Sequence, residues 1–296
     1  MLLSNLSKVI SVNKTYNFTK NKYFSAITSN SKFTNNKTLF IYDKNTKVKK
    51  IYLDEALKNK TPAIISNKYI NNLKIPQFLV SNINLETYSL LNKLHNNPPF
   101  KTLAVTGTNG KTSVVWYISK ILNSLKYNNT IVGTLGHFIN GKKINNVNLT
   151  TPAYEELFKY GSSNKKQKNI YIFEASSHAL EQNRLRNYPI NIAAITNISK
   201  DHLDYHKTFS DYKKSKIRLF TNHLESSGFA IINSRLKISK ELKNKLIKKN
   251  VKLKYFGNKS IKLIKFNEFV YLNIVNKKYK LKNLKLKTDI ELENLE

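Results

Sequence analysis

The sequence contains no cysteine, and only four of its 51 basic residues are arginine. The missing cysteines exclude disulfides and thiolate metal sites, which is compatible with a reducing compartment. No stretch approaches the ~20 apolar residues that a membrane-spanning helix needs. The opening MLLSNLSKVISVNK is interrupted by Ser, Asn and Lys, so it is not a secretory signal. We expect a soluble, cytoplasmic protein that has no membrane partner.

Acidic residues are also scarce, because 18 Asp and Glu stand against 51 Lys and Arg and give a formal net charge of +33. Such a charge is typical of nucleic-acid binders. The alternative is a composition rich in Lys, Asn and Ile, as an AT-rich genome would produce. Recognition of nucleic acid relies strongly on the planar fork of arginine, and the lysines here are spread along the whole chain. We therefore favour composition bias and expect no nucleic-acid partner, although a phosphate-rich substrate would benefit from the positive field.

A chain of 296 residues with 40% hydrophobic content predicts two domains. The run NNPPF follows a helical pattern, and paired prolines after asparagine favour a domain boundary. We place it after residue 97, giving domains 1–97 and 98–296. The first domain is predicted to contain two short buried strands, at 38–43 and 62–66, and two helices, at 52–60 and 82–96.

Beyond the boundary, strands alternate with helices, which predicts a parallel, doubly wound sheet. The helix expected over 151–161 has Pro152 in its first turn. From Val251 onward the pattern changes to alternating strands with polar turns, interpreted as antiparallel hairpins. The other expected elements are strands at 101–107, 129–134, 169–175, 190–197 and 228–234 and helices at 111–125 and 209–224.

The segment TGTNGKTS, residues 106–113, has the outline of a phosphate-binding loop between a strand and a helix. The common nucleotide loop reads G-x-x-x-x-G-K-[ST], whereas here the earlier glycine stands only three residues before the later one. The shorter loop can still bind phosphate, because the glycines let the backbone approach the anion closely and the helix amides face it. An ordinary glycine turn before a helix is the weaker alternative. The candidate residues for binding ATP are Gly107, Thr108, Asn109, Gly110, Lys111, Thr112 and Ser113, with the Thr112 hydroxyl available to Mg²⁺.

This loop resembles that of the Mur ligase family and its folylpolyglutamate synthetase relatives. LTTPAYEEL (149–157) and the long segment 173–220, which begins FEASSHALEQNR, resemble one branch of that family. That branch adds the third amino acid of the peptidoglycan stem peptide. The resemblance implies an α/β fold with a smaller N-terminal substrate domain and a central, mostly parallel P-loop ATPase domain that ends in antiparallel hairpins.

The implied activity is ATP-dependent amide formation through an acyl phosphate. Its implied substrates are UDP-N-acetylmuramoyl-L-alanyl-D-glutamate and a diamino acid, most often meso-2,6-diaminopimelate, and the implied protein is a monomer. By the same resemblance Lys111, Glu174, His202 and Lys216 are catalytic. Lys216 would carry a carboxyl group as N6-carboxylysine and would join Thr112, Glu174 and His202 as a Mg²⁺ ligand. Spacing alone does not single out one lysine in so lysine-rich a chain.

The resemblance also implies a set of substrate-binding residues, namely Ser31, Thr150, Thr151, Ser176, Gln182 and Arg184. The sequence departs from the family around the first of these, since it reads Asn30-Ser31-Lys32 where the family has Asp-Ser-Arg. The family's third domain holds the pocket for the incoming amino acid, and we expect this chain to lack that domain. The sequence then leaves the added amino acid unidentified, and the chain alone would bind substrates without turnover.

Two other functions remain open at this point. A folylpolyglutamate synthetase-like ligase would share the loop, but the TTP and SSHALEQNR segments argue against it. A basic P-loop ATPase acting on nucleic acid would explain the charge, yet it leaves the segment from Glu174 to Lys216 unexplained.

Overall fold

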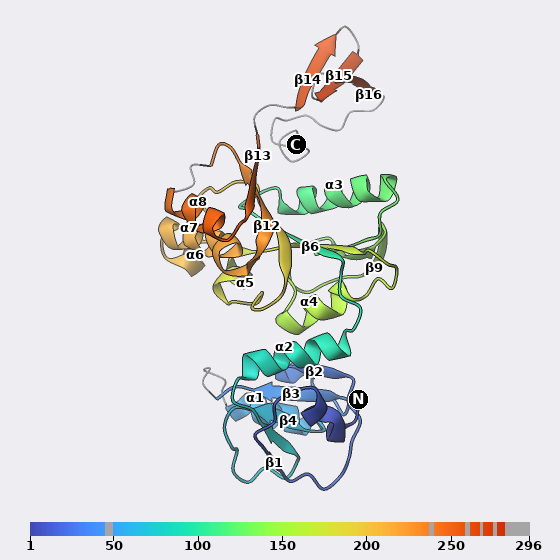
Figure 1. The fold of residues 1–296 in the computed structure, drawn as a ribbon, viewed down its shortest axis with the longest axis vertical. Coiled ribbons are helices and arrows are strands. Elements are labelled where there is room, and N and C mark those ends of the chain that lie inside the picture. The colour runs from blue at the N-terminus through green and yellow to red at the C-terminus, as the bar shows by residue number, and fades with distance from the viewer. Residues whose placement is uncertain (45–49, 237–239, 258–260, 267–268, 275–276, 282–296) are drawn as a thin grey trace. The chain divides into compact units, whose positions relative to one another are not determined.

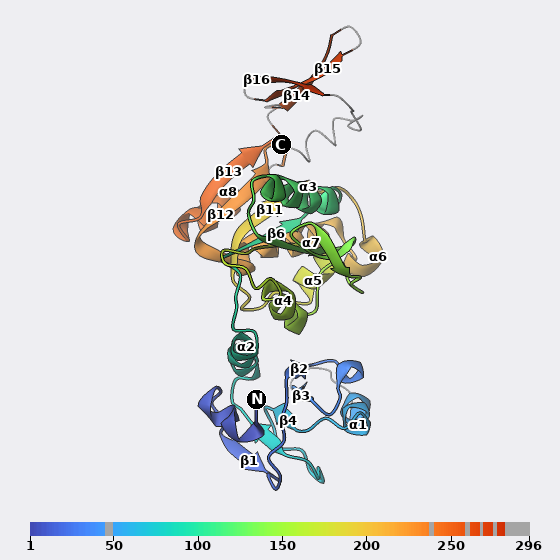
Figure 2. The same cartoon turned by 90° about the vertical axis from the view of Figure 1, so that its right-hand side faces the viewer.

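The computed structural model describes residues 1–44, 50–236, 240–257, 261–266, 269–274 and 277–281 (Figure 1, Figure 2). The chain divides into two compact units, Met1–Pro98 and Pro99–Glu296. Each unit is built around its own sheet, as expected for a mixed α/β protein with two mostly parallel sheets, and the predicted fold class is confirmed.

The first unit contains a five-stranded sheet in the order β1-β5-β4-β3-β2. The pairs from β2 to β5 are parallel, and β1 lies antiparallel at one edge. The strands are β1 (Lys14–Tyr16), β2 (Ala26–Thr28), β3 (Thr38–Tyr42), β4 (Ile64–Ser66) and β5 (Gln77–Leu79), and the helices are η1 (Leu3–Lys8), η2 (Ser31–Phe33), α1 (Lys50–Lys58) and α2 (Ile83–Leu94).

The apolar pattern of this unit accounts for its core. All five residues of β3 are buried, as expected for a central strand of a sheet that is covered on both faces. In α1 the buried side chains are Leu53 and Ala56, one turn apart. The α2 helix begins where the Asn82 side chain accepts a hydrogen bond from the backbone of Leu85. Local capping and periodicity therefore agree with the tertiary packing.

The second unit contains an eight-stranded sheet in the order β13-β12-β11-β6-β10-β7-β8-β9. It is parallel from β13 to β7 and ends in an antiparallel meander, β7-β8-β9. Its strands are β6 (Lys101–Thr106), β7 (Asn129–Gly133), β8 (Gly136–Ile139), β9 (Lys142–Asn145), β10 (Ile170–Glu174), β11 (Ile190–Ile195), β12 (Leu224–Asn233) and β13 (Lys252–Phe256).

Helices cover both faces of this sheet, as Figures 1 and 2 show. The Ile172 side chain of β10 packs under α3, whereas Tyr171 and Phe173 lie on the opposite face with Tyr188. Among the described residues no helix combines the length and apolarity needed to cross a bilayer. The helices are α3 (Lys111–Ser124), α4 (Tyr154–Gly161), α5 (Ser177–Glu181), α6 (Leu203–His206), α7 (Phe209–Arg218), the π-helical turn η3 (Leu219–His223) and α8 (Lys240–Lys248).

Two sequence predictions about this unit are wrong. The α4 helix begins at Tyr154 with Ala153 as its N-cap, so Pro152 precedes the helix; the Glu156 carboxylate accepts the Ala153 N–H and fixes this start. Residues 252–256 do not form an antiparallel hairpin, because α8 carries the chain back and β13 pairs in parallel with β12. The antiparallel prediction holds for the separate sheet of β14 (Ile261–Phe266), β15 (Phe269–Ile274) and β16 (Lys277–Leu281).

The β8–β9 hairpin was not predicted, although its signal is in the sequence. Asn140 and Gly141 both have positive φ, 50° and 81°. An Asn-Gly pair with this geometry is the favoured two-residue connection of a hairpin. The turn extends the parallel sheet with two antiparallel strands.

The β3 core provides the first testable prediction. Phe40 is fully buried, and Phe40→Ala should lower the free energy of unfolding by about 3–5 kcal/mol because it leaves a cavity. Phe33→Ala in the same unit is the matched control, since Phe33 is 56% exposed and should change stability by under about 1 kcal/mol. Chemical denaturation followed by circular dichroism measures both. Equal effects of the two substitutions would contradict this assignment of the core.

Candidate active site

The predicted phosphate loop connects β6 to α3 and depends on its two glycines. Gly110 is the N-cap of α3 with φ 84°. Gly107 has φ 145°, and a Cβ at this position would lie 1.9 Å from the Thr196 hydroxyl oxygen. No larger residue fits at Gly107 without moving Thr196, which follows β11. The first N–H groups of α3 have no intrahelical acceptor, so the loop can present donors to an anion.

The segment after β11 holds this loop in place. The backbone N–H of Thr108 donates to the Asn197 carbonyl oxygen at 3.0 Å, and the Asn109 N–H donates to the Asn197 side-chain oxygen at 2.9 Å. The Thr196 hydroxyl donates to the Asn109 carbonyl at 2.6 Å. The loop is therefore fixed by the neighbouring parallel strand as well as by its own turn.

Two lysines meet at one carbonyl of the loop. Lys111 Nζ donates to the carbonyl oxygens of Gly107 and Thr108 at 3.0 and 2.9 Å. Lys216 Nζ reaches the same Gly107 carbonyl from α7 at 2.7 Å. Burial lowers the pKa of Lys111, while the charges of Glu174 and Asp201 oppose that shift.

Lys216 is only 1% exposed. Burial, and after it the charge of Lys111, lowers the pKa of Lys216 from 10.5 to about 7. A large fraction of this amine is therefore neutral near pH 7 and carries a free electron pair. An exposed lysine would be almost fully protonated at the same pH.

Glu174 occupies the carboxyl end of β10, beside the loop. Its side chain is buried, and one oxygen, Oε2, accepts the Thr112 hydroxyl at 2.9 Å. The other oxygen, Oε1, accepts the Thr134 backbone N–H at 2.8 Å. Burial raises the pKa of Glu174, and the hydrogen bonds from Thr134 and Thr112 and the charge of Lys111 oppose this rise. The carboxylate is thus an anionic oxygen pair held next to a helix N-terminus.

Tyr212 lies between the loop and the histidine-containing segment. Its hydroxyl is 3.0 Å from the Thr108 hydroxyl, and Lys216 Nζ lies 4.4 Å from the centre of its ring. The His202 ring is 6.3 Å from the same ring and 5.0 Å from His178. His202 is exposed at the start of α6. These contacts connect α6 to α7 and to the phosphate loop.

The predicted metal ligands are partly brought together. Thr112 and Glu174 are in direct contact and offer the hard oxygen atoms that Mg²⁺ prefers. Among the described residues no contact joins His202 to either of them, and no group of three or more His, Cys, Asp or Glu side chains could hold a metal ion. The Lys216 side chain would offer a metal oxygen atoms only with an added carboxyl group.

The predicted substrate-binding residues of this unit form two small networks. Thr151 donates its hydroxyl to the Ser176 hydroxyl at 3.0 Å and accepts the Ser176 N–H at 2.8 Å. Arg184 Nε donates to the Gln182 side-chain oxygen at 2.8 Å. The Thr150 hydroxyl is 3.3 Å from that of Thr134. The first network joins the segment before α4 to the start of α5, directly after Glu174.

Ser31 lies in the first unit, within η2. It is buried and donates its hydroxyl to the Glu55 carboxylate. Asn30 caps η2, since its side-chain oxygen accepts the Lys32 N–H. The Asn-Ser-Lys segment is therefore a defined turn.

Ser113, the last residue of the predicted phosphate loop, lies in the first turn of α3.

Sequence reasoning missed three residues of this site: Thr134, Asn197 and Tyr212. Thr134 follows directly on β7 and Asn197 stands two residues after β11, and the carboxyl ends of parallel strands carry functional groups. Tyr212 stands four residues before Lys216, on the same face of a helix. These positional signals were present in the sequence.

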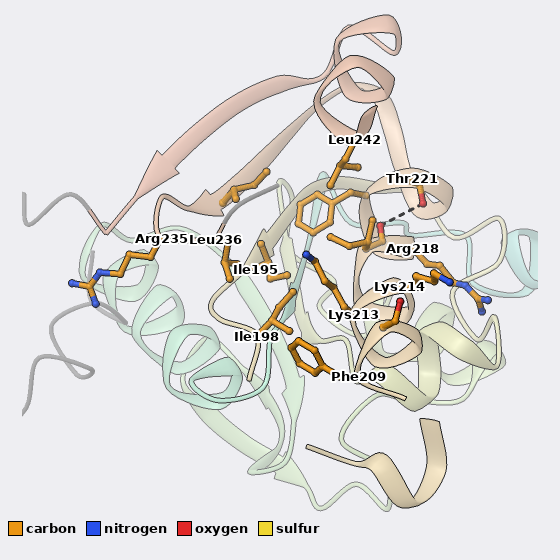
Figure 3. A pocket seen from close by; sticks show the side chains of 14 residues that line it. Ile195, Ile198, Phe209, Lys213, Lys214, Arg218, Thr221, Arg235, Leu236 and Leu242 are labelled. Atoms are coloured by element: carbon orange, nitrogen blue, oxygen red, sulfur yellow. Dashed lines mark hydrogen bonds between the residues drawn. The ribbon is translucent and has the colours of Figure 1, made fainter. Parts of the chain in front are cut away.

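A cavity of about 670 Å³ lies on another side of α7, and Figure 3 shows its lining. Apolar side chains such as Ile195, Phe209 and Leu242 line it together with Lys213 and Arg235. None of the predicted site residues does so. Of the predicted site residues, Lys111, Thr112, Glu174 and Lys216 meet at the phosphate loop instead.

A family model and several known proteins match this chain. Residues 105–292 match the Mur ligase middle domain. The UDP-N-acetylmuramoyl-L-alanyl-D-glutamate--2,6-diaminopimelate ligase of Rickettsia prowazekii is 35% identical over 245 residues, covering 81% of this chain and 51% of that protein. The Rickettsia typhi ligase of the same name is 33% identical over 270 residues, covering 86% and 55%. The chain spans about half the length of the curated relatives it matches.

Solved structures show the same fold. A UDP-N-acetylmuramoyl-L-alanyl-D-glutamate--2,6-diaminopimelate ligase superposes with a TM-score of 0.69 at 24% identity, covering 92% of this chain and 58% of that one. The MurF ligase of Thermotoga maritima in complex with ADP superposes with a TM-score of 0.52 at 19% identity, covering 91% and 60%.

The shifted pKa of Lys216 yields a prediction for stability. Between its folded pKa of about 7 and the ordinary value near 10.5, the unfolded chain binds more protons, so the free energy of unfolding rises with pH. Below this window both states are protonated, and the cost of burying the charge is fully present. Lys216→Met should therefore stabilise the protein most below about pH 7, and this gain should shrink as the pH rises.

Urea denaturation from about pH 6 to about pH 9 in buffer free of CO₂ measures this difference. The control is Lys213→Met, which removes an amine from the exposed side of the same helix. A constant effect of Lys216→Met across the range would refute the buried, partly neutral amine.

Proposed function

The chain belongs to the Mur ligase family, and we propose that it supplies the substrate- and ATP-binding parts of a ligase that adds 2,6-diaminopimelate to UDP-N-acetylmuramoyl-L-alanyl-D-glutamate in peptidoglycan synthesis. The names of the curated relatives support this choice. The observation that carries it is the meeting of Lys111, Glu174 and the buried Lys216 around one phosphate loop. A simple nucleotide hydrolase has no evident need for a buried, near-neutral lysine there.

ATP is the proposed nucleotide, and the ADP-bound MurF ligase of Thermotoga maritima supports it. The residues fit a polyphosphate, because Gly107 leaves the loop free of side-chain bulk and α3 starts directly behind it. Lys111 now bonds two loop carbonyls. When phosphate oxygens enter, its ammonium turns from these carbonyls to the phosphates and holds them by charge.

Mg²⁺ is the proposed metal, and its role is to neutralise charge on the phosphates. Thr112 and Glu174 would hold it through oxygen atoms that are already in contact. Burial among Thr112, Thr134 and the backbone keeps the Glu174 carboxylate in one orientation. His202 would complete the set from the start of α6.

The role proposed for Lys216 follows from its neutral amine. The nitrogen forms a bond to the carbon of CO₂ and loses a proton, which yields an anionic carbamate on a long side chain. The positive charge of Lys111 nearby favours that product. Lys216 would then contribute oxygen in place of a cationic nitrogen.

The proposed reaction begins when a carboxylate of the UDP substrate attacks the γ-phosphate and ADP leaves. The amine of the amino acid then displaces phosphate from the acyl group. Both steps need position more than covalent help from the protein. Thr150, Thr151, Ser176, Gln182 and Arg184 are proposed to hold the substrate beside the loop. Ser31 is proposed to contact its uridine end.

The proposal includes a monomeric, cytoplasmic protein without a nucleic-acid or membrane partner. A folylpolyglutamate synthetase-like function is not favoured, because curated relatives at 33–37% identity share the diaminopimelate ligase name. The same relatives disfavour an ATPase that acts on nucleic acid.

Titration calorimetry tests the proposal directly. UDP-N-acetylmuramoyl-L-alanyl-D-glutamate is titrated into the chain with and without Mg²⁺ and a non-hydrolysable ATP analogue. We expect a saturable binding isotherm. A folded chain that binds the nucleotide but not this substrate would overturn the proposed substrate class.

Lys111→Ala should weaken binding of the ATP analogue more than about tenfold, since a charge-assisted contact to phosphate is lost. Lys120→Ala is the matched control, because Lys120 lies on the same helix and packs over Trp116, 4.7 Å from the ring centre. The control should keep the wild-type affinity by calorimetry. Similar losses in both variants would point to general charge rather than to a loop contact.

Thr151→Ala should weaken binding of the UDP substrate by about fivefold to tenfold, because it removes the hydroxyl that joins Ser176 at the start of α5. Affinity for the ATP analogue, measured on the same preparation, serves as the internal control and should not change. Loss of both affinities would indicate a disrupted fold and would contradict a specific substrate role.

A further inference from the structure

We propose that Thr134 is a positioning residue that links the substrate-side threonines to the Glu174 carboxylate. The inference rests on the proposed function, in which Thr150 holds the UDP substrate and Glu174 holds Mg²⁺. Thr134 follows β7 and precedes the β8–β9 hairpin. It belongs to neither the phosphate loop nor the Thr150–Thr151 pair.

The turn at the end of β7 is shaped around Glu174. A Cβ on Gly133 would lie 2.1 Å from Glu174 Oε1, and its three nearest neighbours would all be atoms of that side chain. The next residue, Thr134, donates its backbone N–H to the same oxygen at 2.8 Å. Glu174 is thus enclosed on one side by a glycine that leaves room for it and by an amide that holds it.

The Thr134 hydroxyl has a second role, because it lies between two groups. It is 3.4 Å from Glu174 Oε2 and 3.3 Å from the Thr150 hydroxyl. A carboxylate can only accept, so when Thr134 donates to Glu174, its own oxygen must accept from Thr150. The three groups then form a directed chain, Thr150 to Thr134 to Glu174.

The residue next to Thr150 is connected to the Glu174 segment by a second set of hydrogen bonds. Thr151 exchanges hydrogen bonds with Ser176, two residues after Glu174. Thr134 is exposed and Thr150 is half-buried, so a ligand can reach both hydroxyls. A ligand that accepts the Thr150 proton takes away the donor to the Thr134 oxygen, which weakens the cooperative hydrogen bond from Thr134 to Glu174. Occupancy of the substrate side should therefore alter how Glu174 holds its own ligand.

Calorimetry on the whole chain measures this link as a coupling factor, the ratio of affinities for the Mg²⁺-loaded ATP analogue with and without the UDP substrate. Thr134→Val removes the hydroxyl and keeps both the shape and the backbone N–H. We expect it to lower the coupling factor by about fivefold, the effect of one lost hydrogen bond. Thr134→Ser keeps the hydroxyl and should retain the wild-type factor.

The matched control is Thr130→Val, on the same strand, whose hydroxyl donates to Asn169 at 3.2 Å instead. It should leave the coupling factor unchanged. An unchanged factor in Thr134→Val, or an equal loss in Thr134→Ser or Thr130→Val, overturns the inference. Wild-type chain that binds both ligands without coupling also overturns it but leaves the proposed function standing. Wild-type chain that does not bind the UDP substrate overturns the proposed function itself.

Discussion

The carbonyl oxygen of Gly107 is the point on which the site depends, because the side-chain nitrogens of Lys111 and Lys216 both bond to it. One lysine comes from the helix that follows the loop and the other from α7, more than a hundred residues later. Two lysine side chains can share this small volume only if the loop backbone faces them and a carboxylate lies near. The register between β6, β10 and β11 supplies both conditions, since it places Glu174 opposite Val105 and Thr196 beside the loop. Moving any of these strands by one residue would separate the charges.

The sequence was sufficient for the parts of the fold that have local causes. The segments 101–107 and 190–197 predicted buried parallel strands, and the loop glycines predicted the start of α3. The sequence was insufficient where contacts with other segments decide how a strand pairs or where a helix begins. Residues 252–256 alternate like a hairpin strand, yet α8 returns them to the parallel sheet beside β12. Pro152 suits a first helical turn, yet the Glu156 carboxylate fixes the start of α4 two residues later.

The candidate site shows the same division. Residues that lie within one motif, such as Gly107 to Ser113, could be selected from the sequence. Lys216 required a family resemblance, because nothing local distinguishes one lysine among so many. Tyr212 and Thr134 were missed because their importance comes from hydrogen bonds to residues far away along the chain, namely Thr108 and Glu174. Their roles are therefore properties of the folded arrangement.

The abundance of lysine has a consequence at the borders of the sheets. The two edge strands of the eight-stranded sheet are β9 and β13. In the five-stranded sheet of the first unit, β1 is the antiparallel edge strand. Lysines occupy positions 142 and 143 in β9, 252 and 254 in β13, and 14 in β1. An uncovered edge strand invites pairing with another chain, and repulsion between lysine charges opposes it. A composition set by genome bias would thus also hinder edge-to-edge aggregation.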